Sequence, residues 1–161
     1  MLILLVQVLV LHRISPGWEG VHYVQFFLYP LFIMLLPFQT PKVVVLLLAF
    51  CLGILVDLFY GTSGLHASPL IAMAFIRPAV IKYLEPRGGY TAAQSPTKER
   101  MGMPWFLRYS AFLLVVHLFL YFLVESFTFV EIGEILLKTI LSFIGSMIFI
   151  MMAILIFNPK Q

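Results

Sequence analysis

Long apolar runs constrain the fold of this chain more than any other feature of its sequence. Residues 43–58 form one such run, in which Asp57 is the only charged side chain. About 20 helical residues cross a hydrocarbon core of about 30 Å, and runs of this kind are typical of membrane-spanning helices. Hydrophobic residues make up 62% of the chain and charged residues only 11%, against roughly 25% charged in soluble domains. We therefore expect an all-α integral membrane protein.

The runs and the breaks between them predict a single polytopic membrane domain over residues 1–161, built as a bundle of about six transmembrane helices. The expected helices lie near residues 1–14, 22–37, 42–60, 65–84, 104–126 and 132–157. The first of them is short, and Pro30 removes a backbone donor from the second and should kink it. Five helices plus a re-entrant segment is therefore the alternative.

The distribution of Lys and Arg predicts the orientation of the helices. Five of these residues lie close together in the chain, namely Lys82, Arg87, Lys98, Arg100 and Arg108. Cytoplasmic loops carry an excess of such residues, so we place residues 85–103 in the cytoplasm as a flexible basic loop that attracts anionic membrane lipids. With six helices, both chain termini also lie in the cytoplasm.

The sequence indicates neither an enzyme nor a nucleic-acid-binding protein. The net charge of +3 comes from basic residues between apolar runs, where membrane topology accounts for them. Cys51 is the only cysteine, which excludes a disulfide framework and a Cys/His zinc spacing. The chain has no Gly-rich phosphate loop, no HExxH helix and no GxSxG elbow. We expect no catalytic residues, no cofactor and no metal.

Three titratable residues are expected at membrane depth, where ionisable groups are costly and usually functional or paired. A rise of about 1.5 Å per residue along the expected helices places Asp57, His117 and Lys138 at a similar depth. One interpretation is a buried pair, either Asp57–Lys138 or Asp57–His117, that neutralises the carboxylate or carries protons. The other is that Lys138 extends toward the headgroups and His117 bonds a neighbouring helix.

Small residues recur on the face of the expected helix that carries Asp57. Ala49, Gly53, Asp57 and Gly61 are spaced four residues apart and so share one side of a helix. Such a face predicts close packing against another helix, from the same chain or from a partner. Arg77 lies near the cytoplasmic end of the next expected helix, where its side chain can extend to the headgroups.

A compact pattern surrounds Asp57, made of a glycine, the aspartate four residues later, and a turn that ends in Gly-Leu-His. The residues are Gly53, Asp57, Gly61, Gly64, Leu65 and His66. This segment resembles the MreD family of rod shape-determining proteins, as do residues 4–11 and 35–41. The resemblance is most specific over residues 35–84, and the loop 85–103 departs from the family.

The resemblance implies a non-enzymatic scaffold in the inner membrane of bacteria, within the machinery for cell elongation and peptidoglycan synthesis. Its implied partner is MreC, with RodA, a class B penicillin-binding protein and MreB as direct or indirect partners. The resemblance also implies a helical arrangement similar to the substrate-binding subunits of energy-coupling-factor transporters. In the scaffold, residues 61–67 form an outer hairpin in which Gly64, Leu65 and His66 contact a partner.

The competing hypothesis is a membrane-embedded subunit that binds or transports a solute. In that case four side chains, those of Asp57, Arg77, His117 and Lys138, would line a polar cavity. The small number of polar residues within the apolar runs disfavours this interpretation.

Overall fold

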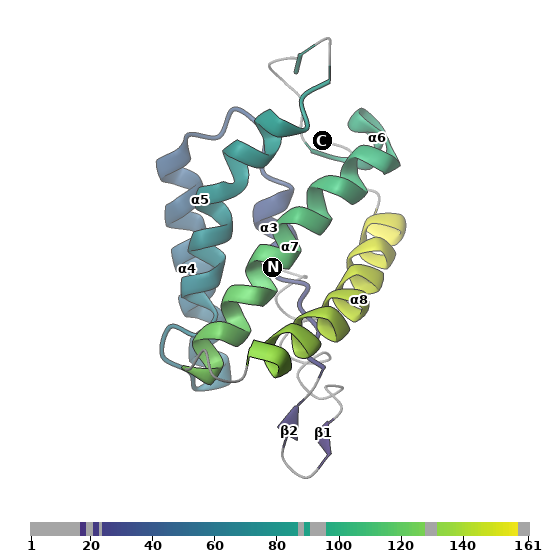
Figure 1. The fold of residues 1–161 in the computed structure, drawn as a ribbon. Helices are drawn as coiled ribbons and strands as arrows, with labels where there is room; N and C mark the ends of the chain where they lie inside the picture. Colours follow the sequence, from purple (N-terminus) through teal and green to yellow (C-terminus); the bar gives the residue numbers. More distant parts are fainter. Residues whose placement is uncertain are drawn as a thin grey trace.

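The computed structural model describes residues 17–18, 21–22, 24–86, 89–90, 96–127 and 132–157. Four long helices of this part form one bundle: α4 (Lys42–Tyr60), α5 (Ala67–Tyr83), α7 (Met103–Ser126) and α8 (Ile132–Phe157). α4 packs on α5, α5 on α7 and α7 on α8, as Figure 1 shows. The all-α expectation is thus confirmed for the bundle, while the expected helix 1–14 lies outside the described residues.

The ends of the long helices follow from the turn residues beside them. α4 begins directly after Pro41 and ends at Gly61, whose left-handed conformation (φ +66°) is a common way to terminate a helix. α7 follows Gly102 and has Pro104 in its first turn, a position where proline loses no hydrogen bond. These helices therefore begin and end within one or two residues of the expected positions.

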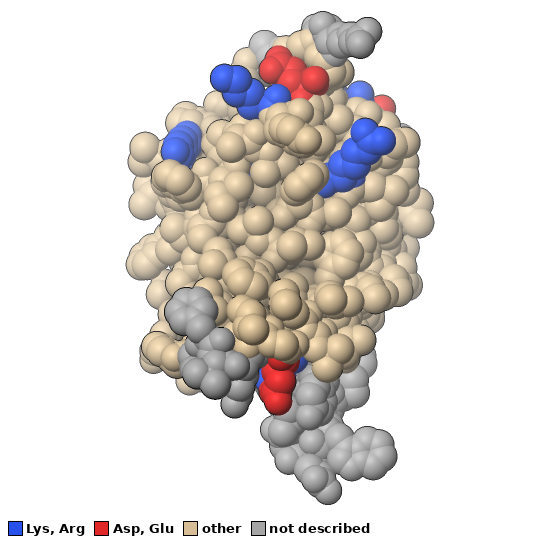
Figure 2. Space-filling view, viewed as in Figure 1, with Lys and Arg blue, Asp and Glu red and all other residues tan. Residues whose placement is uncertain are grey.

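Three of the helices are long and apolar enough to cross a membrane. They span Lys42–Tyr60, Met103–Ser126 and Ile132–Ile156. Large apolar side chains are exposed along their outer faces, for example Leu58, Phe112 and Ile144. In Figure 2 the visible Lys, Arg, Asp and Glu side chains lie near the two ends of the molecule, and a broad band without such residues separates them.

The expected helix 22–37 is wrong. Val21–His22 (β2) pairs with Gly17–Trp18 (β1) in a short antiparallel ladder, residues 24–28 are not helical, and α3 covers only Pro30–Met34. Pro30 cannot donate to a preceding carbonyl and its ring blocks the helix before it, so α3 begins at this residue. The residue before Pro37 is biased against helical conformation, which limits α3 at its other end.

The broken segment 24–36 runs through the centre of the bundle (Figure 1). Its side chains supply much of the core, because Phe27, Tyr29, Leu31 and Ile33 are almost fully buried. The expected loop 85–103 contains one further short helix, α6 (Lys98–Met101). The main departure from the expected fold is thus an interior segment whose backbone N–H and C=O groups need hydrogen-bond partners from other parts of the chain.

Candidate functional site

The residues around Asp57 form one tight unit that joins α4 to α5. The Asp57 carboxylate accepts four hydrogen bonds: from the Thr62 hydroxyl (2.6 Å), from the His66 backbone N–H (2.9 Å), from His66 Nδ1 (2.9 Å) and from the Ala67 backbone N–H (3.1 Å). An ionised carboxylate only accepts hydrogen bonds, so Nδ1 carries the proton in this contact. Asp57 and His66 are both buried.

The Asp57 carboxylate caps the N-terminus of α5. The first N–H groups of a helix have no partner within the helix, and a negative charge is favoured beside them. The usual cap is a side chain at the N-cap position, but His66 occupies that position and makes no such bond. Asp57 replaces it from the end of the preceding helix, so one carboxylate sets the geometry of two helices.

Gly53 lets the two helices approach closely. A Cβ atom at this position would lie 2.4 Å from the Ala67 Cα, which is far inside van der Waals contact. Ala49, one turn earlier, is fully buried. The small-residue face therefore packs within the chain, as expected for Ala49 and Gly53. Gly61 differs, because a Cβ there would meet no atom within 4 Å and its role is the left-handed end of α4.

Of the two interpretations left open by the sequence, the one in which Asp57 pairs with Lys138 or His117 is wrong. Within the described part of the chain the side-chain partners of Asp57 are Thr62 and His66, and none of its hydrogen bonds involves His117 or Lys138. His117 Nε2 instead lies 2.8 Å from the Tyr29 hydroxyl, with both side chains fully buried. Lys138 is only half-buried on α8. Equal depth did not bring these groups together, because α4 packs mainly on α5, whereas His117 lies on α7 and Lys138 on α8.

Aromatic rings fill the space between the two histidines. His66 lies 5.2 Å from Tyr121 and 5.9 Å from Tyr29, measured between ring centroids. Phe27 packs at 4.7 Å from Tyr121 and at 5.8 Å from His117. Edge-to-face arrangements of this kind add to the stability of a buried cluster. The broken segment, which supplies Phe27 and Tyr29, is thus packed directly against the α4–α5 unit.

Two serines of α8 bind the backbone of the broken segment. Ser142 accepts a hydrogen bond from the Gln25 N–H (3.0 Å), and Ser146 accepts one from the Phe27 N–H (2.9 Å). The two serines are four residues apart and face the same side of the helix. Gly145 lies between them, and a Cβ there would sit 2.3 Å from the Phe26 ring. α8 therefore has its own face of small residues, against which the non-helical residues 25–27 pack.

Arg77 binds the other end of the same segment. Its guanidinium donates to the Leu36 carbonyl and, over 2.9 Å, to the Tyr109 hydroxyl, which donates in turn to the Met34 carbonyl (2.9 Å). Arg77 is 2% exposed, so the expectation that it extends to the headgroups is wrong. Carbonyl groups at the end of a helix have no hydrogen-bond donors within the helix. Arg77 and Tyr109 donate to these carbonyls instead.

Sequence reasoning missed the residues whose hydrogen bonds hold the broken segment in place, namely Tyr29 within the segment and Tyr109, Ser142 and Ser146 on the helices around it. A signal for two of them was present, because Ser142, Gly145 and Ser146 repeat on α8 the small-residue pattern recognised around Gly53. The tyrosines had no such signal, since their hydroxyls pair with groups distant in the sequence. Gly64 and Leu65 are partly exposed in the hairpin 61–67, whereas His66 is buried.

The hydrogen bonds of Asp57, Arg77 and His117 stabilise the fold. Each of these three side chains binds a protein group. Asp57 and His117 lie on two sides of one aromatic cluster, and Arg77 lies at the other end of the broken segment. No group of three or more His, Cys, Asp or Glu side chains that could hold a metal ion occurs among the described residues. No protein-family model, no curated protein and no solved structure matches the chain.

Proposed function

We propose that this chain is a multi-pass scaffold protein of the bacterial cytoplasmic membrane that acts in the cell-elongation machinery, as its resemblance to the MreD family implies. The observation that supports the proposal best is the unit around Asp57. The residues that carry the resemblance are neighbours in space, where Asp57 caps α5, Gly53 permits the helix contact and Gly61 ends α4. A motif of this kind holds a hairpin in one defined shape.

The chemistry of the interior favours a scaffold over a solute-binding subunit. A solute site needs convergent polar groups that remain available to a ligand. Asp57, Arg77 and His117 are instead engaged with a helix N-terminus, a helix C-terminus and a tyrosine hydroxyl. Three of the four side chains that the solute-binding hypothesis places around a ligand thus already bind protein groups.

The membrane topology of the proposal has the basic end of the bundle in the cytoplasm. Lys42, Lys82, Arg100 and Arg108 lie at or near the start of α4, the end of α5 and the start of α7, whereas Glu125 and Glu134 lie near the other end. The excess of basic residues then faces the cytoplasm. The broken segment provides the second of six crossings, and buried non-helical backbone is tolerated at membrane depth where protein surrounds it.

The proposed partner surface is the exposed part of the outer hairpin. Gly61 and Ser63 are exposed, and Leu65 is partly exposed. His66 stabilises the hairpin from inside, so it shapes this surface without forming part of it. MreC is the first expected partner, followed by RodA, the class B penicillin-binding protein and MreB.

Affinity capture after gentle solubilisation of native membranes, with mass-spectrometric identification of the partners, tests the proposal. Wild type should recover MreC or the cell-wall synthases. Ser63→Arg, which alters the exposed hairpin without removing a described hydrogen bond, should recover less of them while keeping the melting temperature of wild type. Recovery of an ATPase module and a bound solute would instead make the chain a transport subunit.

Thermal unfolding of the purified protein across a panel of vitamins and metabolites provides an independent test. A ligand at 100 times its dissociation constant stabilises its protein by about 2.7 kcal/mol. A scaffold should show no such response, and a reproducible shift with one solute would contradict the proposal.

A further inference from the structure

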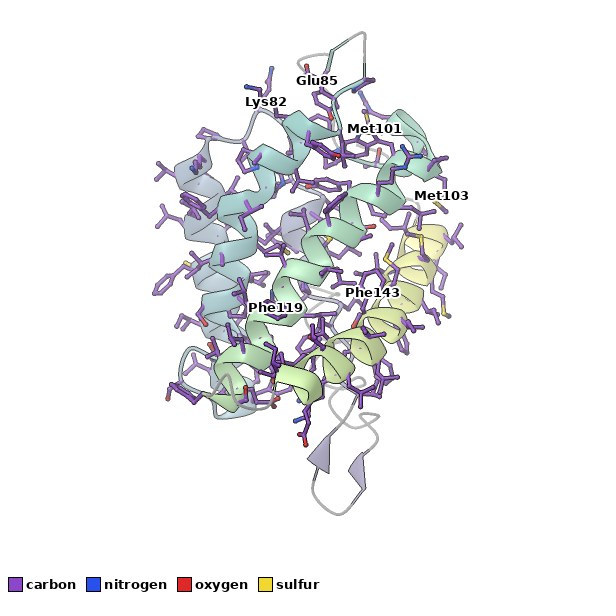
Figure 3. The ribbon with its side chains drawn as sticks, in the orientation of Figure 1. Lys82, Glu85, Met101, Met103, Phe119 and Phe143 are labelled. Carbon is purple, nitrogen blue, oxygen red and sulfur yellow. The ribbon has the colours of Figure 1, made fainter. Side chains whose placement is uncertain are left out.

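A groove at the basic end of the bundle carries two charged side chains of opposite sign. It has a volume of about 560 Å³ and lies between the end of α5 and the start of α7, and its lining consists of Tyr83, Leu84, Glu85, Met101, Pro104, Trp105 and Arg108. Figure 3 shows Glu85 and Met101 at this end of the molecule. Sites for small ligands commonly have volumes of about 300–1,000 Å³.

Both charged groups of this groove are available to a ligand. Within the described part of the chain, neither the Arg108 guanidinium nor the Glu85 carboxylate has an ion-pair or hydrogen-bond partner, and both side chains are exposed. The rest of the lining is apolar or aromatic. The Trp105 indole N–H donates to the Leu84 carbonyl over 2.8 Å. This bond fixes the orientation of the indole ring, which forms one side of the groove.

A second, apolar groove adjoins the first along the bundle. It has a volume of about 430 Å³ and is lined by Ala79, Val80, Tyr83 and Phe112. Tyr83 belongs to the lining of both grooves, and its ring lies 6.0 Å from the Phe112 ring between centroids. An amphipathic ligand could therefore place a polar head between Arg108 and Glu85 and an apolar tail along α5 and α7.

We propose that these two grooves bind one phosphatidylethanolamine molecule, with its phosphate on Arg108, its ammonium group on Glu85 and an acyl chain in the apolar groove. Charge complementarity selects this occupant. The planar guanidinium suits a phosphate, and the carboxylate accepts N–H bonds from a primary ammonium. Phosphatidylcholine has no N–H to donate, and phosphatidylglycerol has no cation to place beside Glu85.

The site presupposes the membrane insertion proposed above, but it does not depend on any partner protein. Tyrosine and tryptophan are enriched where a membrane protein meets the headgroups. Tyr83 and Trp105 lie at the basic end of the bundle, which is the level the headgroups of the cytoplasmic leaflet would occupy. The lipid would thus be bound between α5 and α7 on the side opposite to the outer hairpin.

Native mass spectrometry of the detergent-purified protein, titrated with dioleoyl phosphatidylethanolamine, phosphatidylcholine or phosphatidylglycerol, tests the site. An exposed ion pair contributes up to about a fivefold change in affinity, so the first phosphatidylethanolamine should bind about fivefold more tightly than either other lipid. Glu85→Gln should abolish this preference, and Arg108→Gln should weaken the first binding of all three lipids.

Lys42→Gln is the matched control, because it removes one positive charge from the same end of the bundle without altering either groove. It should leave the preference for phosphatidylethanolamine unchanged. Equal binding of the three lipids to wild type, or a preference that survives Glu85→Gln, would overturn the lipid site. If partner capture persists in that case, the scaffold proposal remains and only the lipid site fails.

Discussion

Replacement of Asp57 by asparagine tests whether this carboxylate is a helix cap. Asparagine has nearly the same shape, and its one oxygen can keep the three contacts now made to Oδ1, those from the Thr62 hydroxyl, the His66 N–H and His66 Nδ1. Its NH₂ group then faces the Ala67 N–H, which is 3.1 Å from Oδ2 in the wild type. Two donors would meet there, and the negative charge at the start of α5 would be lost.

The expected cost of Asp57→Asn follows from these losses. A buried N–H without a partner costs about 1–3 kcal/mol, and the lost charge at the helix N-terminus costs about 0.3–1 kcal/mol. The three remaining bonds lose their charge assistance, which adds about 1 kcal/mol. We therefore expect Asp57→Asn to lower the free energy of unfolding by about 2–5 kcal/mol.

Unfolding in mixed micelles with increasing dodecyl sulfate, followed by far-ultraviolet circular dichroism, measures this difference. Thr62→Val should cost about 1 kcal/mol, because it removes one of the four bonds. Ser63→Ala in the same turn should stay within about 0.5 kcal/mol of wild type. If Asp57→Asn and Thr62→Val both unfold like wild type, the carboxylate is not the cap inferred from its contacts.

Three further substitutions probe the packing and the broken segment, each by the same unfolding measurement. Gly53→Ala should cost about 1–3 kcal/mol, since its Cβ overlaps the backbone of α5, whereas Gly133→Ala, with no atom within 4 Å, should be neutral or stabilising. Ser146→Ala leaves the buried Phe27 N–H unpaired and should cost about 1–3 kcal/mol. Tyr109→Phe removes the bonds to one guanidinium and one carbonyl and should cost about 2–5 kcal/mol. A neutral result for either of the last two would mean that water or another group satisfies the freed atoms.

The sequence by itself determined the class of the fold and the positions of the long helices. Apolar runs of nearly 20 residues separated by Pro- and Gly-containing turns have few other stable forms, and α4 and α8 begin and end where those runs do. The close approach at Gly53 was also predictable, because a face of small residues has little purpose except contact. These features depend on local composition and spacing, which a sequence displays directly.

Only the tertiary structure decided the form of residues 24–36. A short apolar run fits a buried extended segment as well as a helix, and the choice depends on whether neighbours can satisfy the free backbone groups. Here the neighbours are Ser142 and Ser146 on one helix and Arg77 with Tyr109 on two others. Nothing local to the segment indicates that these partners exist.

The partner of Asp57 was likewise settled by the tertiary structure, although it lies only nine residues away. Depth along a helix indicates which residues share a level, but not which way each side chain points. The left-handed turn at Gly61 brings the start of α5 back to the Asp57 side chain. The first N–H groups of α5 have no other hydrogen-bond partner once they are buried. The carboxylate therefore binds these N–H groups in preference to a side chain at the same depth.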